Sequence, residues 1–185
     1  MRDVIRIGGR LAIICAVAAT VLGGINALTE PRIEWIQQQR LEEALKEVSG
    51  GADTGERNEV EGRDVVKAYY PIYAEGSEAV TGYVLRLIGQ GYSGDMVILA
   101  AFKPDGEVLS AELMQNKETP GLGKEAEKEG YMEKYTGTGD DEAIPVRKDM
   151  LSQEEADSIT GATITFIGIG KALAKGSDFV KDLEG

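Results

Sequence analysis

The segment Asp157-Ser-Ile-Thr160-Gly161-Ala162-Thr163 holds residue types that can bind a phosphate group. It stands directly before a stretch that predicts a closing helix over residues 163–183, and Thr160 or Thr163 can serve as the N-cap. The first N–H groups of a helix are free and lie at the positive end of its dipole, while Gly161 and Ala162 leave room for a bulky group. The segment therefore predicts a helix N-terminus that binds an anion, with the hydroxyls of Thr160 and Thr163 next to it. An ordinary capped helix is the alternative.

A second segment, Glu118-Thr119-Pro120-Gly121-Leu122-Gly123, follows a predicted strand and is rich in residues that stiffen or tighten a turn. Proline restricts the backbone and the two glycines allow a ligand to approach it closely. The segment predicts a stiff loop whose backbone N–H groups face a ligand. A plain turn is the alternative.

The composition narrows the chemistry to that of an organic cofactor. The 185 residues include no histidine and a single cysteine, Cys15. This excludes a histidine-based triad, a Cys/His zinc site, a histidine-ligated haem, an intrachain disulfide and a self-contained iron–sulfur cluster, which needs about four thiolates. The net charge of −12 argues against a nucleic acid as partner. Any redox chemistry must therefore be carried by an organic group.

Together the two segments resemble the signatures of a known family. Asp-x-x-Thr-Gly-Ala-Thr, residues 157–163, resembles the flavinylation motif of FMN-binding domains, and residues 118–123 resemble the second signature of the same domain. With one N-terminal span, this order resembles the G subunits of Rnf-type ion-translocating electron-transport complexes, relatives of the C subunit of the sodium-translocating NADH:quinone oxidoreductase. The chain departs from the pattern at Thr160, where serine is commoner, and at Asn116-Lys117, where relatives often have histidine.

The resemblance implies the roles of individual residues. A flavin transferase would join FMN through its phosphate to Thr163, while Gly161 and Ala162 admit the phosphate and Asp157 assists the transferase. The implied cofactor-binding set is Thr163, Asp157, Thr160, Gly161, Ala162, Glu118, Thr119, Pro120, Gly121, Leu122 and Gly123, with no metal ligand and no catalytic residue. Tyr92 and Tyr131 are candidates for stacking on the flavin ring, and core or surface aromatics are the alternative for both.

The resemblance also implies a function. The chain would be an electron carrier with covalent FMN in a membrane complex that couples ferredoxin/NAD electron transfer to sodium or proton translocation, and would not be catalytic alone. The alternative is a membrane-anchored binding or assembly module that does not use its flavin motif. The pumped ion, the direct donor and acceptor, and the choice between the Rnf complex and its sodium-pumping relative stay open.

Residues 11–29 form an uncharged stretch long enough to cross a bilayer as a helix. Arg2, Arg6 and Arg10 precede it, so the positive-inside rule predicts a cytoplasmic N-terminus and an extracytoplasmic remainder, anchored in the cell (inner) membrane. A cleaved signal sequence is the alternative. The best cleavage site would follow Ala27, and Ile25 is poorly suited to the position three residues before the cut. A lipoprotein site at Cys15 would need a small residue directly before the cysteine, where the chain has Ile14.

Small residues recur along one face of this stretch, at Ala12, Ala16, Thr20 and Gly24. Such a face allows close helix–helix approach in lipid, which predicts a partner helix from another membrane subunit. The alternative is that alanine and glycine are simply common in membrane spans.

The rest of the chain predicts an α+β fold, an antiparallel sheet with flanking helices. We expect the membrane helix within residues 1–29, a linking amphipathic helix and loop within 30–57 with Pro31 as its first helical residue, and the FMN-binding domain over 58–185. The expected elements of that domain are strands at 65–74, 79–88, 96–102 and 108–114, a short helix at 123–135, a helical turn at 153–157 and the closing helix at 163–183, with Ile164, Ile167, Leu173 and Val180 on its apolar side.

Gly89-Gln-Gly91-Tyr-Ser-Gly94 matches the G-x-G-x-x-G pattern of dinucleotide-binding loops. That pattern requires a helix directly after it, and residues 95–102 instead read as a strand. The segment is therefore interpreted as a glycine-rich link between two strands.

Overall fold

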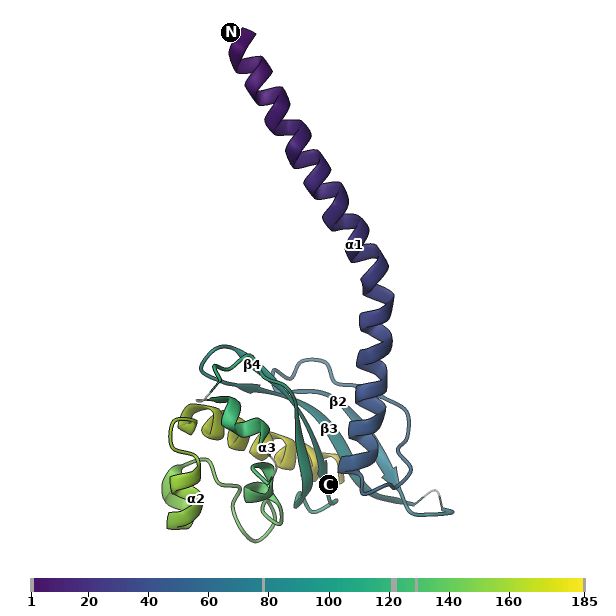
Figure 1. The fold of residues 1–185 in the computed structure, drawn as a ribbon. Helices are drawn as coiled ribbons and strands as arrows, with labels where there is room; N and C mark the ends of the chain where they lie inside the picture. The colour runs from purple at the N-terminus through teal and green to yellow at the C-terminus, as the bar shows by residue number, and fades with distance from the viewer. Residues whose placement is uncertain (1, 78, 121–122, 129, 185) are drawn as a thin grey trace. The chain divides into compact units, whose positions relative to one another are not determined.

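The computed structural model describes residues 2–77, 79–120, 123–128 and 130–184 (Figure 1). The chain forms two compact units, Met1–Glu42 and Glu43–Gly185, and each is described by itself.

The first unit consists of α1 (Arg2–Val48), a continuous helix whose last residues belong to the second unit. The expected start of a separate helix at Pro31 is wrong, because Pro31 lies inside α1. Proline removes its own N–H bond to the carbonyl of Ala27, and its ring crowds that carbonyl, which can bend a helix without ending it. Helix formers such as Ala27, Leu28 and Gln37 continue the helix across it.

α1 contains one stretch long and apolar enough to cross a membrane, and the residues of its most apolar window are all exposed. Ala12, Ala16, Thr20 and Gly24 are among these exposed residues. The Thr20 hydroxyl donates to the Ala16 carbonyl at 2.8 Å, so this polar group is satisfied within the helix itself. A helix of this kind suits a lipid environment, which cannot satisfy polar groups from outside.

The second unit is built on a five-stranded antiparallel sheet in the order of the sequence. The strands are β1 (Asn58–Glu59), β2 (Val66–Tyr73), β3 (Val80–Gln90), β4 (Asp95–Phe102) and β5 (Val108–Gln115). The four predicted strands are confirmed. β1 was not predicted, because two polar residues carry no alternating pattern and are held only by pairing with Tyr69 and Ala68.

The turn between β4 and β5 is formed as its residues predict. Gly106 has φ +89°, which favours glycine, and its N–H donates to the Lys103 carbonyl at 3.0 Å. The Lys103 ammonium also bonds to the Glu107 carboxylate at 2.6 Å across the turn. These contacts fix the register of the hairpin that leads into the loop after β5.

Short helices and the closing helix follow the sheet. They are the 3₁₀ turns η1 (Gly123–Glu127), η2 (Met132–Tyr135) and η3 (Lys148–Met150), then α2 (Gln153–Ser158) and α3 (Thr163–Glu184). One helix was expected over residues 123–135, and the structure has two 3₁₀ turns there. Gly130 has φ +77°, outside the right-handed helical region, so no continuous helix can pass through it.

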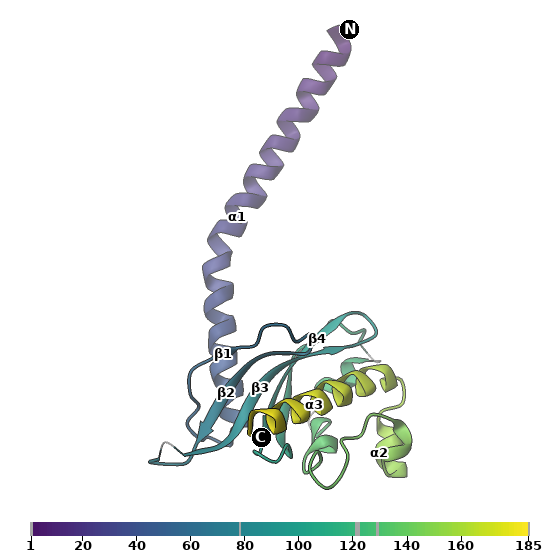
Figure 2. The same ribbon diagram turned by 180° about the vertical axis from the view of Figure 1, so that it is seen from behind.

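α3 packs on one face of the sheet and forms the core with it (Figure 2). Phe166, Ile169, Leu173 and Val180 are its fully buried anchors, spaced as one face of a helix. The expected apolar side was partly wrong: Leu173 and Val180 are buried and the half-buried Ile167 packs against the core, but Ile164 is 53% exposed. Ile164 lies off the face that Phe166 defines, and the sequence alone did not single out Phe166.

A second apolar cluster covers the opposite face of the sheet. Ala44, Leu45 and Val48, at the end of α1 and within the second unit, are buried, as are the sheet residues Tyr70, Ile72, Val84 and Leu99. Glu112 of β5 pairs with Leu99 and therefore lies on the same face. Its Oε2 is buried and has no hydrogen-bond partner within the described residues.

Glu112 predicts a pH-dependent stability. Burial raises the pKa of the Glu112 carboxyl, and the Glu47 carboxylate raises it further. A pKa raised in the folded state means that the neutral form favours folding, and this contribution is lost as the pH rises through the folded-state pKa. Glu112→Gln is therefore expected to stabilise the protein at pH 7, because the amide carries no charge that burial and the Glu47 carboxylate disfavour.

Urea titrations of both proteins across pH check this prediction. The gain should shrink as the pH falls through the folded-state pKa, and it should vanish below the ordinary glutamate pKa of about 4.3, where Glu112 is protonated in both states. Glu107→Gln, at a carboxylate that is 25% exposed and paired with Lys103, is the control and should not stabilise. A gain for Glu112→Gln that is independent of pH would contradict the prediction.

Candidate functional site

The two segments singled out by sequence meet in one pocket of about 320 Å³ within the second unit. The start of α3 contributes Thr163, Ile164 and Thr165, with Gly161 just before it. The loop after β5 contributes Glu118, Thr119 and Gly123, and the β3–β4 link contributes Tyr92. Residues 124–156, a stretch of 33, separate the two segments in the chain, so the fold rather than the sequence brings them together.

The backbone at the start of α3 is arranged to receive an anion. Gly161 has φ +90°, a conformation that favours glycine, and it turns the chain from α2 into α3. The Phe166 N–H donates to the Ala162 carbonyl at 2.9 Å, and the Ala162 N–H donates to the Ile159 carbonyl at 2.9 Å, so the N–H groups of residues 163–165 precede the first bond of the helix. No acidic residue occupies the first turn of α3. This helix start therefore offers donors and a positive dipole end to a phosphate.

The hydroxyls of this segment lie in different surroundings. Thr163 is half-buried and Thr165 is buried, whereas Thr160 is exposed and accepts a hydrogen bond from the Lys148 ammonium at 3.2 Å. Asp157 is exposed, and its carboxylate accepts from the Gln153 amide at 3.1 Å.

The expected N-cap is corrected by the structure. α3 begins at Thr163, and the buried Ala162 stands before it. Neither Thr160 nor Thr163 therefore occupies the N-cap position. The turn at Gly161 places Thr160 outside the helix, where it meets Lys148.

The loop after β5 is held by a small polar network around a buried carboxylate. Glu118 is only 5% exposed, and its N–H donates to Asn116 Oδ1 at 2.7 Å. The Asn116 amide in turn donates to the Gly123 carbonyl at 3.2 Å. Asn116 thus ties the two ends of the loop together, a positioning role that the sequence did not indicate. Thr119 and Pro120 are exposed, and Gly121 and Leu122 lie outside the described residues.

The glycine-rich link set aside in the sequence forms one wall of this pocket. β3 ends at Gln90 and β4 begins at Asp95, which confirms that residues 91–94 join two strands. The Ser93 N–H donates to Glu118 Oε1 at 3.1 Å, and a Cβ on Gly91 would overlap the same oxygen. At Gly123 a Cβ would lie 2.5 Å from Thr165 Oγ1. A side chain at Gly91 or Gly123 would therefore force Glu118 or Thr165 to shift, and glycine allows the link, the loop and α3 to pack closely.

The two tyrosines considered for stacking differ in position. Tyr92 is 77% exposed and lines the pocket. Tyr131 is buried in the core cluster, and its ring lies 4.7 Å from the Lys134 ammonium. Burial raises the pKa of the Tyr131 hydroxyl. Tyr131 is thus a core residue, and only Tyr92 is placed to meet a ligand.

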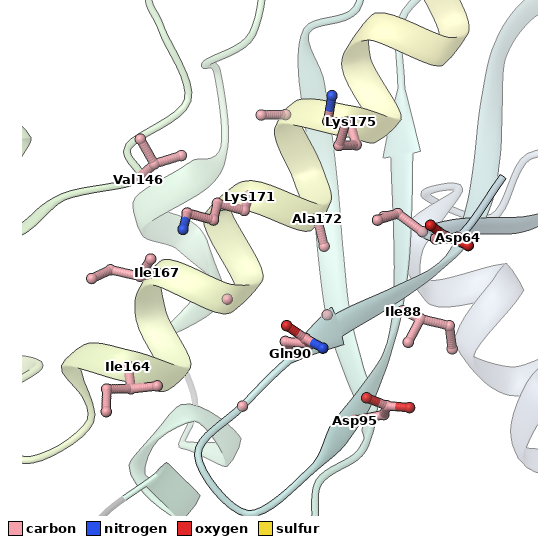
Figure 3. Close-up of a pocket in the computed structure, with 15 residues that line it drawn as sticks. Asp64, Ile88, Gln90, Asp95, Val146, Ile164, Ile167, Lys171, Ala172 and Lys175 are labelled. Atoms are coloured by element: carbon pink, nitrogen blue, oxygen red, sulfur yellow. The ribbon is translucent and has the colours of Figure 1, made fainter.

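A second, larger hollow of about 860 Å³ runs along α3 from the same helix start. Ile164 lines both hollows. Figure 3 shows Ile167, Lys171 and Lys175 following Ile164 along α3, with Gln90 and Asp95 on the strands beside them. The first turn of α3 thus stands between two hollows, a smaller one that holds Thr163 and a larger one along the helix.

Comparisons with known proteins agree with this arrangement. Residues 91–178 match the FMN-binding domain family, and residues 1–48 match the RnfG N-terminal region. The first of these matches begins at the β3–β4 link and includes both segments that form the pocket.

Several curated proteins are similar over most of the chain. The G subunit of the proton-translocating ferredoxin:NAD(+) oxidoreductase complex of Clostridium ljungdahlii is 30% identical, over 90% of this chain and 83% of its own length. The G subunit of the Na(+)-translocating ferredoxin:NAD(+) oxidoreductase complex of Acetobacterium woodii is 30% identical, over 94% and 87%. The G subunit of the ion-translocating oxidoreductase complex of Methanosarcina acetivorans is 27% identical, over 100% and 98%. The chain therefore belongs to the family of G subunits of Rnf-type ion-translocating oxidoreductase complexes, and it carries the FMN-binding domain of that family.

Proposed function

We propose that this chain is an electron-carrier subunit with FMN bound covalently to Thr163, in a membrane complex of the ferredoxin:NAD oxidoreductase type. The observation that carries the proposal is the pocket in which Thr163 lies beside Glu118, Thr119 and Gly123. The names of the relatives support the class of complex. Whether sodium or protons are translocated is left open, because relatives with either ion are similarly close.

The residues at the start of α3 fit the phosphate of FMN. Gly161 bends the chain without a side chain, Ala162 is small and buried, and the helix start offers N–H donors. The proposed cofactor-binding set is Thr163, Asp157, Thr160, Gly161, Ala162, Glu118, Thr119, Pro120 and Gly123, with Gly121 and Leu122 outside the described residues. Tyr92 adds an exposed aromatic ring at the pocket. When bound, FMN supplies one-electron transfer.

Attachment needs a hydroxyl that a second enzyme can reach. Thr163 is only half-buried, and Thr160 and Asp157 beside it are exposed, so a flavin transferase can approach from this side. In the attachment step the Thr163 oxygen would form a bond to phosphorus while the P–O bond to the leaving group of an activated flavin phosphate breaks, and the hydroxyl proton would pass to a base of the transferase. Asp157 is proposed to assist the transferase rather than to bind the flavin ring.

The remaining chain anchors and directs the domain. We infer a cytoplasmic N-terminus and a membrane helix within residues 1–29, a linking segment at 30–57 and an extracytoplasmic FMN-binding domain at 58–185. A covalent link suits this location, because free flavin outside the cell would be lost by dilution.

Co-expression with and without a flavin transferase tests the proposed function. The full chain in detergent should carry in-gel flavin fluorescence after denaturation only when the transferase is present. Its intact mass should then rise by the mass of FMN minus one water. A chain that stays colourless with an active transferase would overturn the proposal and favour an assembly role.

The small-residue face of α1 gives a separate prediction. Ala16→Leu and Gly24→Leu should leave the chain in the membrane and flavinylated, because leucine is apolar and Thr163 is remote in sequence. Both should strongly reduce copurification with other subunits, since the larger side chain separates packed helices. Val17→Leu, off that face, is the matched control. Equal copurification of all three variants would mean that the face does not bind a partner helix.

A further inference from the structure

Glu118 is a buried carboxylate in the wall of the proposed flavin pocket. It is only 5% exposed, and it lines the same pocket as Thr163. The only hydrogen bond that its carboxylate makes within the described part of the chain comes from the Ser93 N–H, at 3.1 Å. No lysine or arginine in that part of the chain forms an ion pair with it. Within the described part of the chain, its carboxylate is therefore held by one N–H group and by no cationic side chain at ion-pair distance.

Burying a carboxylate at this position costs free energy of hydration, so the surrounding chain must stabilise its position. A carboxylate in a buried wall loses hydration that one N–H replaces only in part. The surrounding chain nevertheless fits it closely, because side chains on Gly91 and Gly123 would overlap Glu118. Its own N–H is fixed by Asn116 Oδ1 at 2.7 Å. A residue needed only to close the loop could be an amide, which would accept the same bond from Ser93 at lower cost.

We propose that Glu118 is a positioning residue that sets the redox potential of the flavin through its charge; this rests on the proposed attachment of FMN at Thr163. Reduction adds negative charge to the flavin, and a fixed carboxylate in the same small pocket opposes it. The interaction is screened little by water and salt, because the carboxylate is only 5% exposed and lines the same pocket as Thr163. Glu118 therefore makes the flavin harder to reduce and a stronger electron donor once reduced.

Glu118→Gln tests this inference, because glutamine keeps the shape and the acceptor for Ser93 but removes the charge. The full chain is first checked for covalent flavin by in-gel fluorescence, and loss of flavin from the wild type would count against the proposed function instead. Redox titration should then show a potential shifted to more positive values. The equilibrium constant for flavin reduction should rise about tenfold, the order expected when one unit charge is removed from the wall of a partly buried site.

Glu118→Asp is the matched control, since it keeps the charge but alters the contact with Ser93. Its potential should stay closer to that of the wild type than to that of Glu118→Gln. A potential unchanged in Glu118→Gln, or shifted as far by Glu118→Asp, would overturn the inference and leave Glu118 a structural residue.

A second variant covers a failure of Glu118→Gln to load flavin. Thr119→Lys places a cation at an exposed position of the same pocket, where it offsets the field of the carboxylate. The potential should again rise. An unchanged potential in Thr119→Lys would mean that a charge in this pocket does not act on the flavin, and it would overturn the inference.

Discussion

Thr163→Ala is expected to remove all covalent flavin from the protein while leaving it folded. The substitution deletes the one oxygen that the proposal assigns to the phosphate ester, so no residual attachment should remain. Thr163 is only half-buried, and it lies in the first turn of α3, where alanine is well tolerated. In-gel flavin fluorescence and intact mass measure the loss, and circular dichroism checks that the domain is intact.

Three hydroxyl variants serve as controls for this result. Thr163→Ser retains a hydroxyl and should retain part of the flavin. Thr160→Ala removes an exposed hydroxyl that bonds Lys148, and flavin should still be attached, at a reduced level. Thr165→Ala should also retain covalent flavin, because the Thr165 side chain is buried against Gly123 and its hydroxyl is not exposed to a transferase. Fluorescence that survives in Thr163→Ala and disappears in one of the others would move the attachment to that residue.

Gly168→Ala is expected to destabilise the second unit by about 3 kcal/mol, the upper part of the range for overpacking a core. Gly168 lies on the buried side of α3, where an added Cβ would overlap the carbonyl oxygen of Gln90 at the end of β3. Backbone cannot move aside as a side chain can, so α3 must shift away from the sheet. Helix propensity alone predicts the opposite, a gain of about 1 kcal/mol. Chemical denaturation of flavin-free protein decides between the two.

Gly176→Ala provides a graded control on the same helix. An added Cβ there would lie 2.9 Å from the Phe102 ring and 3.1 Å from a Leu87 methyl group. Both are ends of side chains, which can adjust by a few tenths of an ångström. The cost should therefore be clearly smaller than at Gly168. If Gly168→Ala is as stable as the wild type or more stable, the close approach of α3 to β3 is not present in solution.

Local patterns were sufficient for most of the sheet. β2, β3, β4 and β5 were predicted from runs of branched and aromatic residues bounded by turn signals. The same reasoning failed at Pro31, which lies inside α1, and at Gly130, where a positive φ separates two 3₁₀ turns. In both cases the error is whether a helix continues through one residue. That depends on the backbone conformation and hydrogen bonds of the residues around it, which the residue type alone does not reveal.

The candidate site was foreseen in its parts but not in its assembly. The sequence singled out Thr163 and the loop beginning at Glu118, and their roles toward FMN stay predictions. It gave no signal for Asn116 as the tie across the loop, and it led us to dismiss the link that carries Ser93. The overlap that a Cβ on Gly91 would produce is the reason for glycine there, and only the folded loop creates it.

Residue types and local periodicity by themselves determined that this chain has an apolar helix long enough to span a membrane, an antiparallel sheet and no metal-binding histidines. The absence of histidine is a count, and the helix and the individual strands depend on neighbours within a few residues, which the sequence states directly. The tertiary structure alone decided that Phe166 rather than Ile164 faces the core, and that Glu118 is buried beside Thr163. Both depend on contacts between segments far apart in the chain, where packing chooses which side chains leave water.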